Sequence, residues 1–375
     1  MVHSVCRPSE RIFSQDAFWG LVLLGLLIAQ VFGQPDIPTR GHSSPLDHHT
    51  ELPVHFIVQM LASGQFERMG SFLFGLGMYR CWGKIRQDNP SQDGQRNVRR
   101  LLLGLLAIGL GLSLLLNRPD LLLQYALLGF TLPYFISQSV SSLVGWIVGL
   151  LLLAMLVPSS LGLLHPKRVT HPPDIGWYTL SEWLQTGRSV SQGFTATISY
   201  ELMILGGLLV GKLGLMSPNS QLRVRLSLLL ISVLPLSFLL KGAWVALSLG
   251  LVILPERLLG YQSVLLAFSG FWGALLLTVV YLLELGLNSQ WRLWGWANWL
   301  GQVGQLSVTN YVIQTILYPL LLNGYGLAVS GSSPLWERAA IIGGIYTLQL
   351  GFSWLWMKRY RLGPLELVLQ QWLRR

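Results

Sequence analysis

The chain alternates long apolar runs with short polar stretches. Most of the apolar runs have roughly 17 to 25 residues, the length with which a helix crosses the hydrocarbon core of a bilayer. The pattern therefore predicts an all-α, polytopic transmembrane helix bundle with about ten spans. The predicted spans lie near residues 17–33, 56–79, 101–116, 121–137, 140–157, 194–212, 226–240, 262–287, 303–325 and 339–357.

One apolar stretch is too short to be counted as a span. Residues 243–254 read AWVALSLGLVIL, and about 12 residues favour a re-entrant or interfacial segment over a crossing. An eleventh crossing here would also move the basic carboxyl end of the chain to the outer side. We therefore keep the prediction at ten spans.

The longest predicted connection is an outer loop at residues 158–193. Within it, Thr179 and Glu182 have the spacing of a capping box, and Trp183 and Leu184 follow directly. This pattern predicts a short amphipathic helix that lies on the membrane surface. No other feature divides the chain, so residues 1–375 are expected to form a single membrane domain.

Composition supports a membrane protein and fixes its expected orientation. The 375 residues are 52% hydrophobic and 11% charged, with a mean hydropathy of +0.52, whereas soluble domains are about 25% charged. The net charge of +10 comes from basic residues beside the spans. Most of them fall on one side of a ten-span arrangement, which predicts that both termini are cytoplasmic. The partner is then the lipid bilayer, and no nucleic-acid partner is expected.

The segment SVTNYVIQTILY at residues 307–318 places polar side chains inside a predicted span. Asn310 and Gln314 are one helical turn apart and share a face, with Thr309 beside them. Lipid does not solvate amides, so this face is expected to look into protein or water. Hydrogen bonding between helices is the favoured interpretation, and contact with a substrate is the alternative.

Carboxyl groups also lie in or directly beside the predicted spans. Glu201 stands within the sixth span, Glu284 lies near the end of the eighth, and Asp16 opens the first. An ionisable group in a span costs a few kcal/mol and often marks a functional site. Glu201 is thus a candidate for substrate binding, with a structural role equally open, while Asp16 is also suited to the amino-terminal end of its helix.

The outer stretch DHHTE contains two adjacent histidines, His48 and His49. Solvated loop histidines are the favoured interpretation, because no metal-binding spacing accompanies them and no metal site is predicted. A histidine on this side would nevertheless suit a general base in acyl transfer. His48 and His49 are therefore candidate catalytic residues.

The predicted inner loop, residues 81–100, carries five basic residues. Contact with anionic lipid is the favoured interpretation. The alternative is a docking site for the phosphates of a cytosolic acyl-CoA donor. The loop lacks the glycine patterns of nucleotide-hydrolysing enzymes, so nucleotide hydrolysis is not expected.

Several motifs give the chain a family resemblance. GQLSVTNYVIQTILY at 304–318 and YRLGPLELVLQQWLRR from Tyr360 resemble the carboxyl-terminal motifs of YeiB-like bacterial membrane proteins, so 300–375 forms a YeiB-like motif region. RIFSQDAFWGLVLLGLLIAQVFG, FERMGSFLFGLG, RPDLLLQYALLG and MILGGLLVGKLG resemble the family's other segments in order. The resemblance implies a protein of the bacterial inner membrane.

The YeiB-like family is also distantly similar to transmembrane acyltransferases of the heparan glucosaminide acetyltransferase type. That similarity implies acyl transfer from cytosolic acyl-CoA to an extracytoplasmic glycan or lipid acceptor. It also implies a polar centre made of Asp16, Asp120, Glu182, Arg188, Asn310 and Gln314.

The sequence departs from the family pattern at three positions. Trp19, Gln65 and Leu112 stand where the resemblance expects arginine, lysine and histidine. If the histidine that the resemblance expects is the base in acyl transfer, this chain has Leu112 in its place and lacks that base there. Three functions therefore stay open: an acyltransferase, a small-molecule transporter, and a non-catalytic subunit of a membrane protein partner.

Overall fold

The computed structural model describes residues 13–32, 45–88, 94–116, 119–163, 178–215, 220–252, 254–255, 261–287, 295–322 and 335–374. Within these ranges the regular structure is helical, and no strand occurs. The prediction of an all-α fold is confirmed for this part of the chain.

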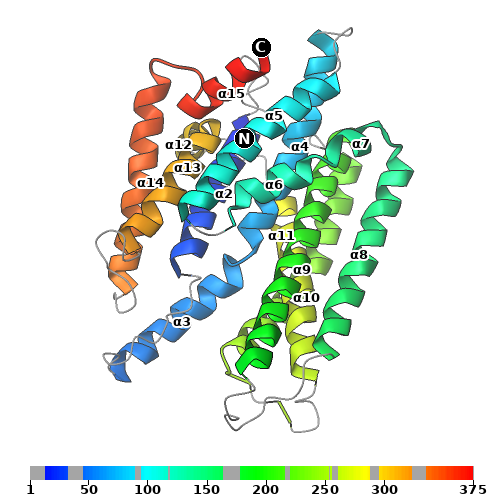
Figure 1. Cartoon of the computed structure of the whole chain (residues 1–375), viewed down its shortest axis with the longest axis vertical. Helices are drawn as coiled ribbons and strands as arrows, with labels where there is room; N and C mark the ends of the chain where they lie inside the picture. The colour runs from blue at the N-terminus through cyan, green and yellow to red at the C-terminus, as the bar shows by residue number, and fades with distance from the viewer. Residues whose placement is uncertain are drawn as a thin grey trace.

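The helices follow one another along the chain (Figure 1). They are α2 (Phe13–Phe32), α3 (Pro45–Leu61), α4 (Gln65–Asp88), α5 (Gly94–Leu116), α6 (Leu121–Gly129), α7 (Leu132–Ser137), α8 (Val140–Leu163), α9 (Tyr178–Leu213), α10 (Ser220–Ser248), α11 (Gln262–Leu287), α12 (Gly295–Gln305), α13 (Ser307–Leu322), α14 (Leu335–Met357) and α15 (Pro364–Arg374).

Six helices in the described ranges are long and apolar enough to cross a membrane, namely α2, α5, α9, α10, α11 and α14. A shorter apolar helical stretch, Val140–Leu156 in α8, comes close to this length. The structure thus supports a membrane-type architecture. Ten crossings and the cytoplasmic position of both termini stay predictions.

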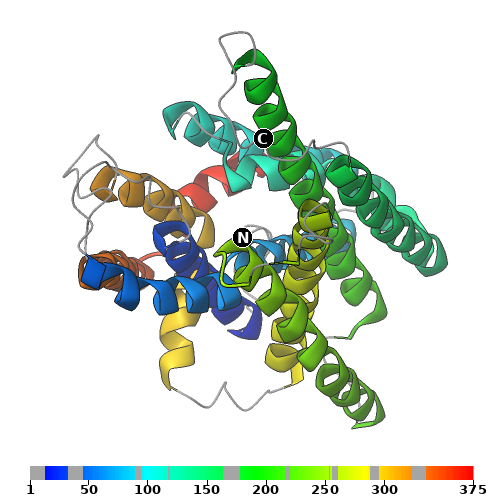
Figure 2. The same cartoon turned by 90° about the horizontal axis from the view of Figure 1, so that it is seen from below.

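The bundle has two sides joined by α4 (Figure 1). Helix α2 packs along α12 and also contacts α13 and α14, while α8 to α11 pack together on the other side. Helix α4 contacts both α2 and α9. Helix α3 lies obliquely across one end of the bundle, as the view from below shows (Figure 2).

Close backbone approach holds the two central helix pairs together. A Cβ atom on Gly75 of α4 would lie 2.1 Å from Ile204 O of α9, and one on Gly304 of α12 would lie 1.7 Å from Asp16 O of α2. Membrane helices use small residues for such contacts because apolar surface gives little driving force within lipid. Dispersion contacts along these seams therefore contribute much of the packing energy.

Three predicted spans are interrupted in the structure. The span predicted at 56–79 is divided between α3 and α4 by residues 62–64, where Gly64 has a φ of +83°. The span at 121–137 is divided between α6 and α7, and the region of 303–325 is divided between α12 and α13 at Leu306. The prediction of continuous helices was wrong here because it followed hydropathy, and the residues at the breaks carry no charge. At the first break, Ser63 and Gly64 are nevertheless typical of turns.

Residues 243–254 do not form a separate re-entrant segment. Helix α10 continues through residue 243 to Ser248, and the chain then turns at Gly250, whose φ is +69°. The predicted helix end at residue 240 was wrong because Lys241 does not end the helix. Its side chain is buried against neighbouring helices.

Both described parts of the predicted outer loop, residues 158–163 and 178–193, are helical. The first is the end of α8, and the second is the beginning of α9, which has 36 residues and is therefore about 54 Å long. The rest of that loop, residues 164–177, lies outside the described residues. Because α9 exceeds the roughly 30 Å hydrocarbon core, one part of it extends beyond the bilayer.

Candidate functional site

The two carboxyl-terminal motifs of the sequence meet at the start of α13. The Glu366 carboxylate in α15 accepts hydrogen bonds from the backbone N–H groups of Val308, at 2.8 Å, and Thr309, at 3.2 Å. The Thr309 hydroxyl also donates to Glu366 Oε2 at 2.5 Å, and it accepts from the N–H of Leu365. Thr309 therefore anchors α15 to α13, and it does so from a buried position.

The two amides of the same motif face α14. Asn310 Nδ2 donates to Ser353 Oγ at 2.9 Å and to Val303 O at 2.9 Å. Gln349 Nε2 donates to Asn310 O at 2.8 Å and to Gln314 Oε1 at 3.2 Å. Asn310 and Gln314 thus form hydrogen bonds between helices, which is the interpretation that their sequence positions favoured.

Tyr311, in the same motif, connects α13 to Asp120. Its hydroxyl donates to Asp120 Oδ1 at 2.8 Å. The other carboxylate oxygen of Asp120 accepts from the N–H of Leu122 at 2.8 Å and so caps the start of α6. Asp120 is buried and serves as a capping residue that holds α6 against α13.

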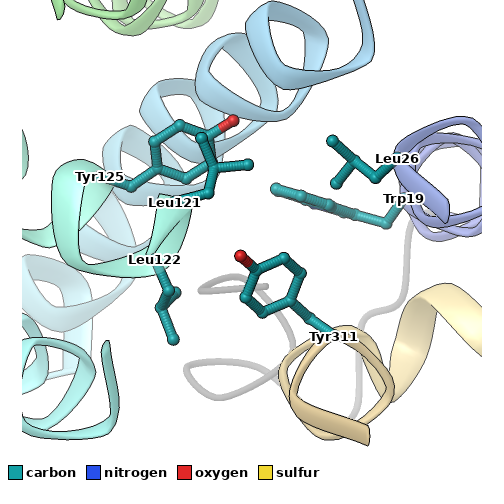
Figure 3. A pocket seen from close by; sticks show the side chains of 6 residues that line it. All are labelled: Trp19, Leu26, Leu121, Leu122, Tyr125 and Tyr311. Atoms are coloured by element: carbon teal, nitrogen blue, oxygen red, sulfur yellow. The ribbon is translucent and has the colours of Figure 1, made fainter. Parts of the chain in front are cut away.

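A narrow apolar gap lies between these helices (Figure 3). Trp19 and Leu26 reach it from α2, and Tyr311 reaches it from α13. The α6 residues Leu121, Leu122 and Tyr125 form the remaining wall. The side chains fill the gap so closely that no water molecule fits in it. In this conformation it is too tight to hold an acyl group.

Asp16 lies near the start of α2, three positions before Trp19. It is buried, its backbone oxygen packs against Gly304, and its charge attracts Arg80 of α4. Arg80 donates a hydrogen bond to the side-chain oxygen of the neighbouring Gln15. Asp16 thus belongs to a contact between α2, α4 and α12.

The three departures from the family pattern occupy buried positions. Trp19 faces the apolar gap, and its indole N–H has no hydrogen-bond partner among the described residues. Gln65 Nε2 donates to Met60 O at 2.9 Å, and Leu112 belongs to the apolar core. These side chains do not supply the charges that the resemblance expects.

A second polar cluster surrounds the break between α3 and α4. Arg68 Nη1 donates to Gly64 O at 2.7 Å, and Lys241 Nζ reaches from α10 to Ser63 O at 3.1 Å. The Tyr200 hydroxyl of α9 donates to the carboxylate of Glu67. We call Glu67, Arg68 and Lys241 the break cluster.

Sequence reasoning missed the break cluster, although one signal was present. Glu67 and Arg68 are adjacent ionisable residues in FERMG, inside a stretch predicted to span the membrane. Lys241 directly follows another apolar run, just beyond the predicted helix end at residue 240. Neither segment alone shows that the two meet, because 178 positions separate Lys241 from Ser63.

Tyr125 connects the break cluster to the apolar gap. Its ring lines the gap, and its hydroxyl donates to the backbone oxygen of Glu67. The ring also packs edge to face against Tyr200, with the centroids 5.9 Å apart. The polar break cluster and the apolar gap are therefore adjacent, with the ring of Tyr125 between them.

Glu201 lies at the break between α6 and α7. The hydroxyl of Thr131, which stands in that break, donates to Glu201 Oε1 at 2.8 Å. Glu201 is buried, and its Oε2 atom has no hydrogen-bond partner among the described residues. A buried carboxyl oxygen without a partner is costly and is a feature of sites that bind or relay.

The remaining candidates lie in helices whose side chains are not described at these positions. Glu182 and Arg188 fall in the first part of α9, and His48 and His49 fall in α3. The DHHTE stretch is therefore helical, which corrects its assignment to a loop. Among the described residues no group of three metal-binding side chains occurs.

The anchor at Glu366 gives the first testable prediction. Burial raises the pKa of Glu366 above its ordinary value of 4.5, although the hydrogen bonds from Thr309 and Val308 act in the opposite direction. A raised folded-state pKa stabilises the fold below pH 4.5, and this stabilisation is lost as pH rises through the folded-state value. We expect Glu366→Gln to remove that loss.

The measurement is the Tm of the detergent-solubilised protein between pH 4.5 and pH 8. The wild type should lose more stability than Glu366→Gln as the pH rises, since other groups contribute equally to both proteins. Parallel curves for the two proteins would contradict a role of Glu366 in this pH dependence.

The fold and these sites define an all-helical protein of membrane type with buried polar clusters at interrupted helices. Its residues 210–375 match a family described as "Protein of unknown function (DUF418)". The chain is also similar to the uncharacterized protein YxaH of Bacillus subtilis (strain 168), with 26% identity over 403 residues, covering 96% of this chain and 93% of that protein. No solved structure matches. Neither match names an activity, a substrate or a location.

Proposed function

We propose that the protein is a small-molecule transporter whose solute path runs through the interrupted helices at the centre of the bundle. The observation that carries the proposal is the break between α3 and α4, with Arg68 and Lys241 bound to its carbonyl groups. Unwound backbone at membrane depth is tolerated where it is buried in protein or lines a cavity. Many transporters place their binding sites at such breaks.

The neighbouring helices support a deep position for this break. Thr278 Oγ1, near the middle of α11, lies 3.5 Å from Gln65 O at the start of α4. Lys241 reaches the break from inside the candidate membrane segment Gln221–Ser248. These contacts support a position of the break within the layer that α10 and α11 are suited to cross.

A second interrupted helix supplies a carboxyl group to the proposed path. Glu201 bonds to Thr131 between α6 and α7, and the adjacent Tyr200 bonds to Glu67. One turn of α9 thus touches both breaks. Carboxyl groups in such positions serve as ion or proton relays, and we assign that role to Glu201.

We further propose ten crossings of a bacterial inner membrane, with both ends in the cytoplasm. The start of α2 and helix α15 lie toward the same end of the bundle (Figure 1), as an even number of crossings requires. In this arrangement most of the basic residues fall in the connections on the cytoplasmic side, as is usual for membrane proteins.

Acyl transfer is less well supported by the contacts. Asp120 caps α6 and accepts from Tyr311, and Leu112 packs in the apolar core. The adjacent gap admits no acyl chain in this conformation. No contact among the described residues favours a non-catalytic subunit. Such a subunit would show no solute uptake in the absence of its partner protein.

Uptake by the purified protein in proteoliposomes tests the transport proposal. The solutes are radiolabelled lactate, choline and lactamide, which represent an anion, a cation and a neutral compound. We expect at least one solute to enter faster than in protein-free vesicles. Uptake equal to that of protein-free vesicles for all three would overturn the proposal.

Glu201→Gln is the variant that tests the relay. It should lower the uptake rate about tenfold or more, because the amide cannot carry the charge of the carboxylate. Glu284→Gln is the matched control, since Glu284 is exposed near the end of α11. Equal uptake by the Glu201→Gln variant and the wild type would remove Glu201 from the path.

A further inference from the structure

The break cluster contains two deeply buried cations. Lys241 is 2% exposed and Arg68 is 9% exposed. Each binds a backbone carbonyl group of the break, Ser63 O and Gly64 O respectively. A carbonyl group offers a dipole and no charge, so these bonds leave the two positive charges uncompensated.

The nearby carboxylate compensates one of the two charges. Glu67 attracts both Arg68 and Lys241, while the two cations repel each other. Glu67 also accepts a hydrogen bond from the hydroxyl of Tyr200. With all three groups ionised, the break cluster carries one excess positive charge inside the bundle.

Further donors in the break cluster are available to a ligand. Arg68 Nε has no hydrogen-bond partner among the described residues. Lys241 Nζ lies 4.2 Å from the ring centroid of Trp244, which holds the ammonium group beside the break. The 24-residue helix α4 begins at Gln65, so its positive amino-terminal end lies at the same place.

We propose that the break cluster binds the carboxylate of a small organic monoanion, with Arg68 and Lys241 as the binding residues. The assignment rests on the transport proposal and names the substrate class of its path. An arginine fork matches a carboxylate, and a lysine adds a point charge. One excess positive charge matches a monoanion better than a phosphate dianion. On binding, the carboxylate replaces Gly64 O and Ser63 O as the partner of the cations.

Ligand binding to the full-length wild type provides the first test. The protein is placed in phosphatidylcholine nanodiscs, which supply no anionic headgroup, and is titrated at constant ionic strength with sodium lactate, lactamide and sodium phosphate. Lactate should raise the Tm in a saturable manner, lactamide should leave it unchanged, and phosphate should act less than lactate. Equal shifts with lactate and lactamide, or a larger shift with phosphate, would overturn the proposal.

Substitution of the two cations provides the second test. Arg68→Gln and Lys241→Gln should each weaken lactate binding about thirtyfold or more, since each removes one partner of a buried charge pair. Lys358→Gln is the matched control, because Lys358 also lies over a tryptophan, Trp354, but is exposed. Folded variants that keep the wild-type affinity would exclude this site. If the variants fail to fold, the comparison of lactate with lactamide on the wild type still decides.

The two proposals fail in distinguishable ways. Lactate binding that depends on Arg68 and Lys241, without uptake in proteoliposomes, would leave the anion site standing and remove the transport function. Uptake of choline or lactamide, unchanged in Arg68→Gln and Lys241→Gln, would keep transport and remove the anion site.

Discussion

Replacing Gly304 by alanine is expected to lower the free energy of unfolding by about 3 kcal/mol, at the upper end of the usual cost of overpacking. The added methyl group would lie 1.7 Å from the backbone oxygen of Asp16 and 2.8 Å from the backbone nitrogen of Gly20. Both neighbours are backbone atoms of α2, so no side-chain rotation relieves the clash. Helices α2 and α12 must separate along the seam that they share.

Gly343 in α14 is the matched control for this substitution. A Cβ atom there meets no other atom within 4 Å, so the alanine gains helix propensity of about 1 kcal/mol without a clash. Gly343→Ala should therefore leave the Tm unchanged or raise it, whereas Gly304→Ala should lower it. Equal Tm values for the two variants in the same detergent would contradict the close packing of α2 on α12.

Replacing Glu366 by alanine is expected to cost about 4 kcal/mol, because it leaves several buried donors without an acceptor. The N–H groups of Val308 and Thr309 stand in the first turn of α13, where no helical carbonyl group is available to them. The Thr309 hydroxyl loses its acceptor as well. The loss should appear as a lower Tm and as detachment of α15 from α13.

Two further variants make this prediction specific. Glu284→Ala removes an exposed carboxylate from α11 and should change the Tm little. Thr309→Val combined with Glu366→Ala should cost less than the sum of the single changes, since both remove the same contact. A Glu366→Ala protein as stable as the wild type, or fully additive effects, would argue against this anchor.

Parts of the candidate site could be predicted from local sequence. The spacing of Asn310 and Gln314 correctly indicated one polar face and hydrogen bonds between helices. The partner of that face could not be predicted, because Gln349 lies in a helix 35 positions beyond Gln314. The same limit applies to Tyr311 and Asp120, which are 191 positions apart.

The sequence by itself determined that this is a helical protein of membrane type, because sparse charge and long apolar runs depend only on composition and order. The tertiary structure alone decided where the helices break and which polar groups meet. Residues 62–64, Ala-Ser-Gly, carry no charge, so hydropathy alone does not locate the break, although Ser63 and Gly64 are typical of turns. Lys241 of α10 bonds to Ser63 O at that break, whereas Arg68 bonds to Gly64 O only four positions earlier in the chain. The contact of Lys241 exists only once α10 has packed against α3.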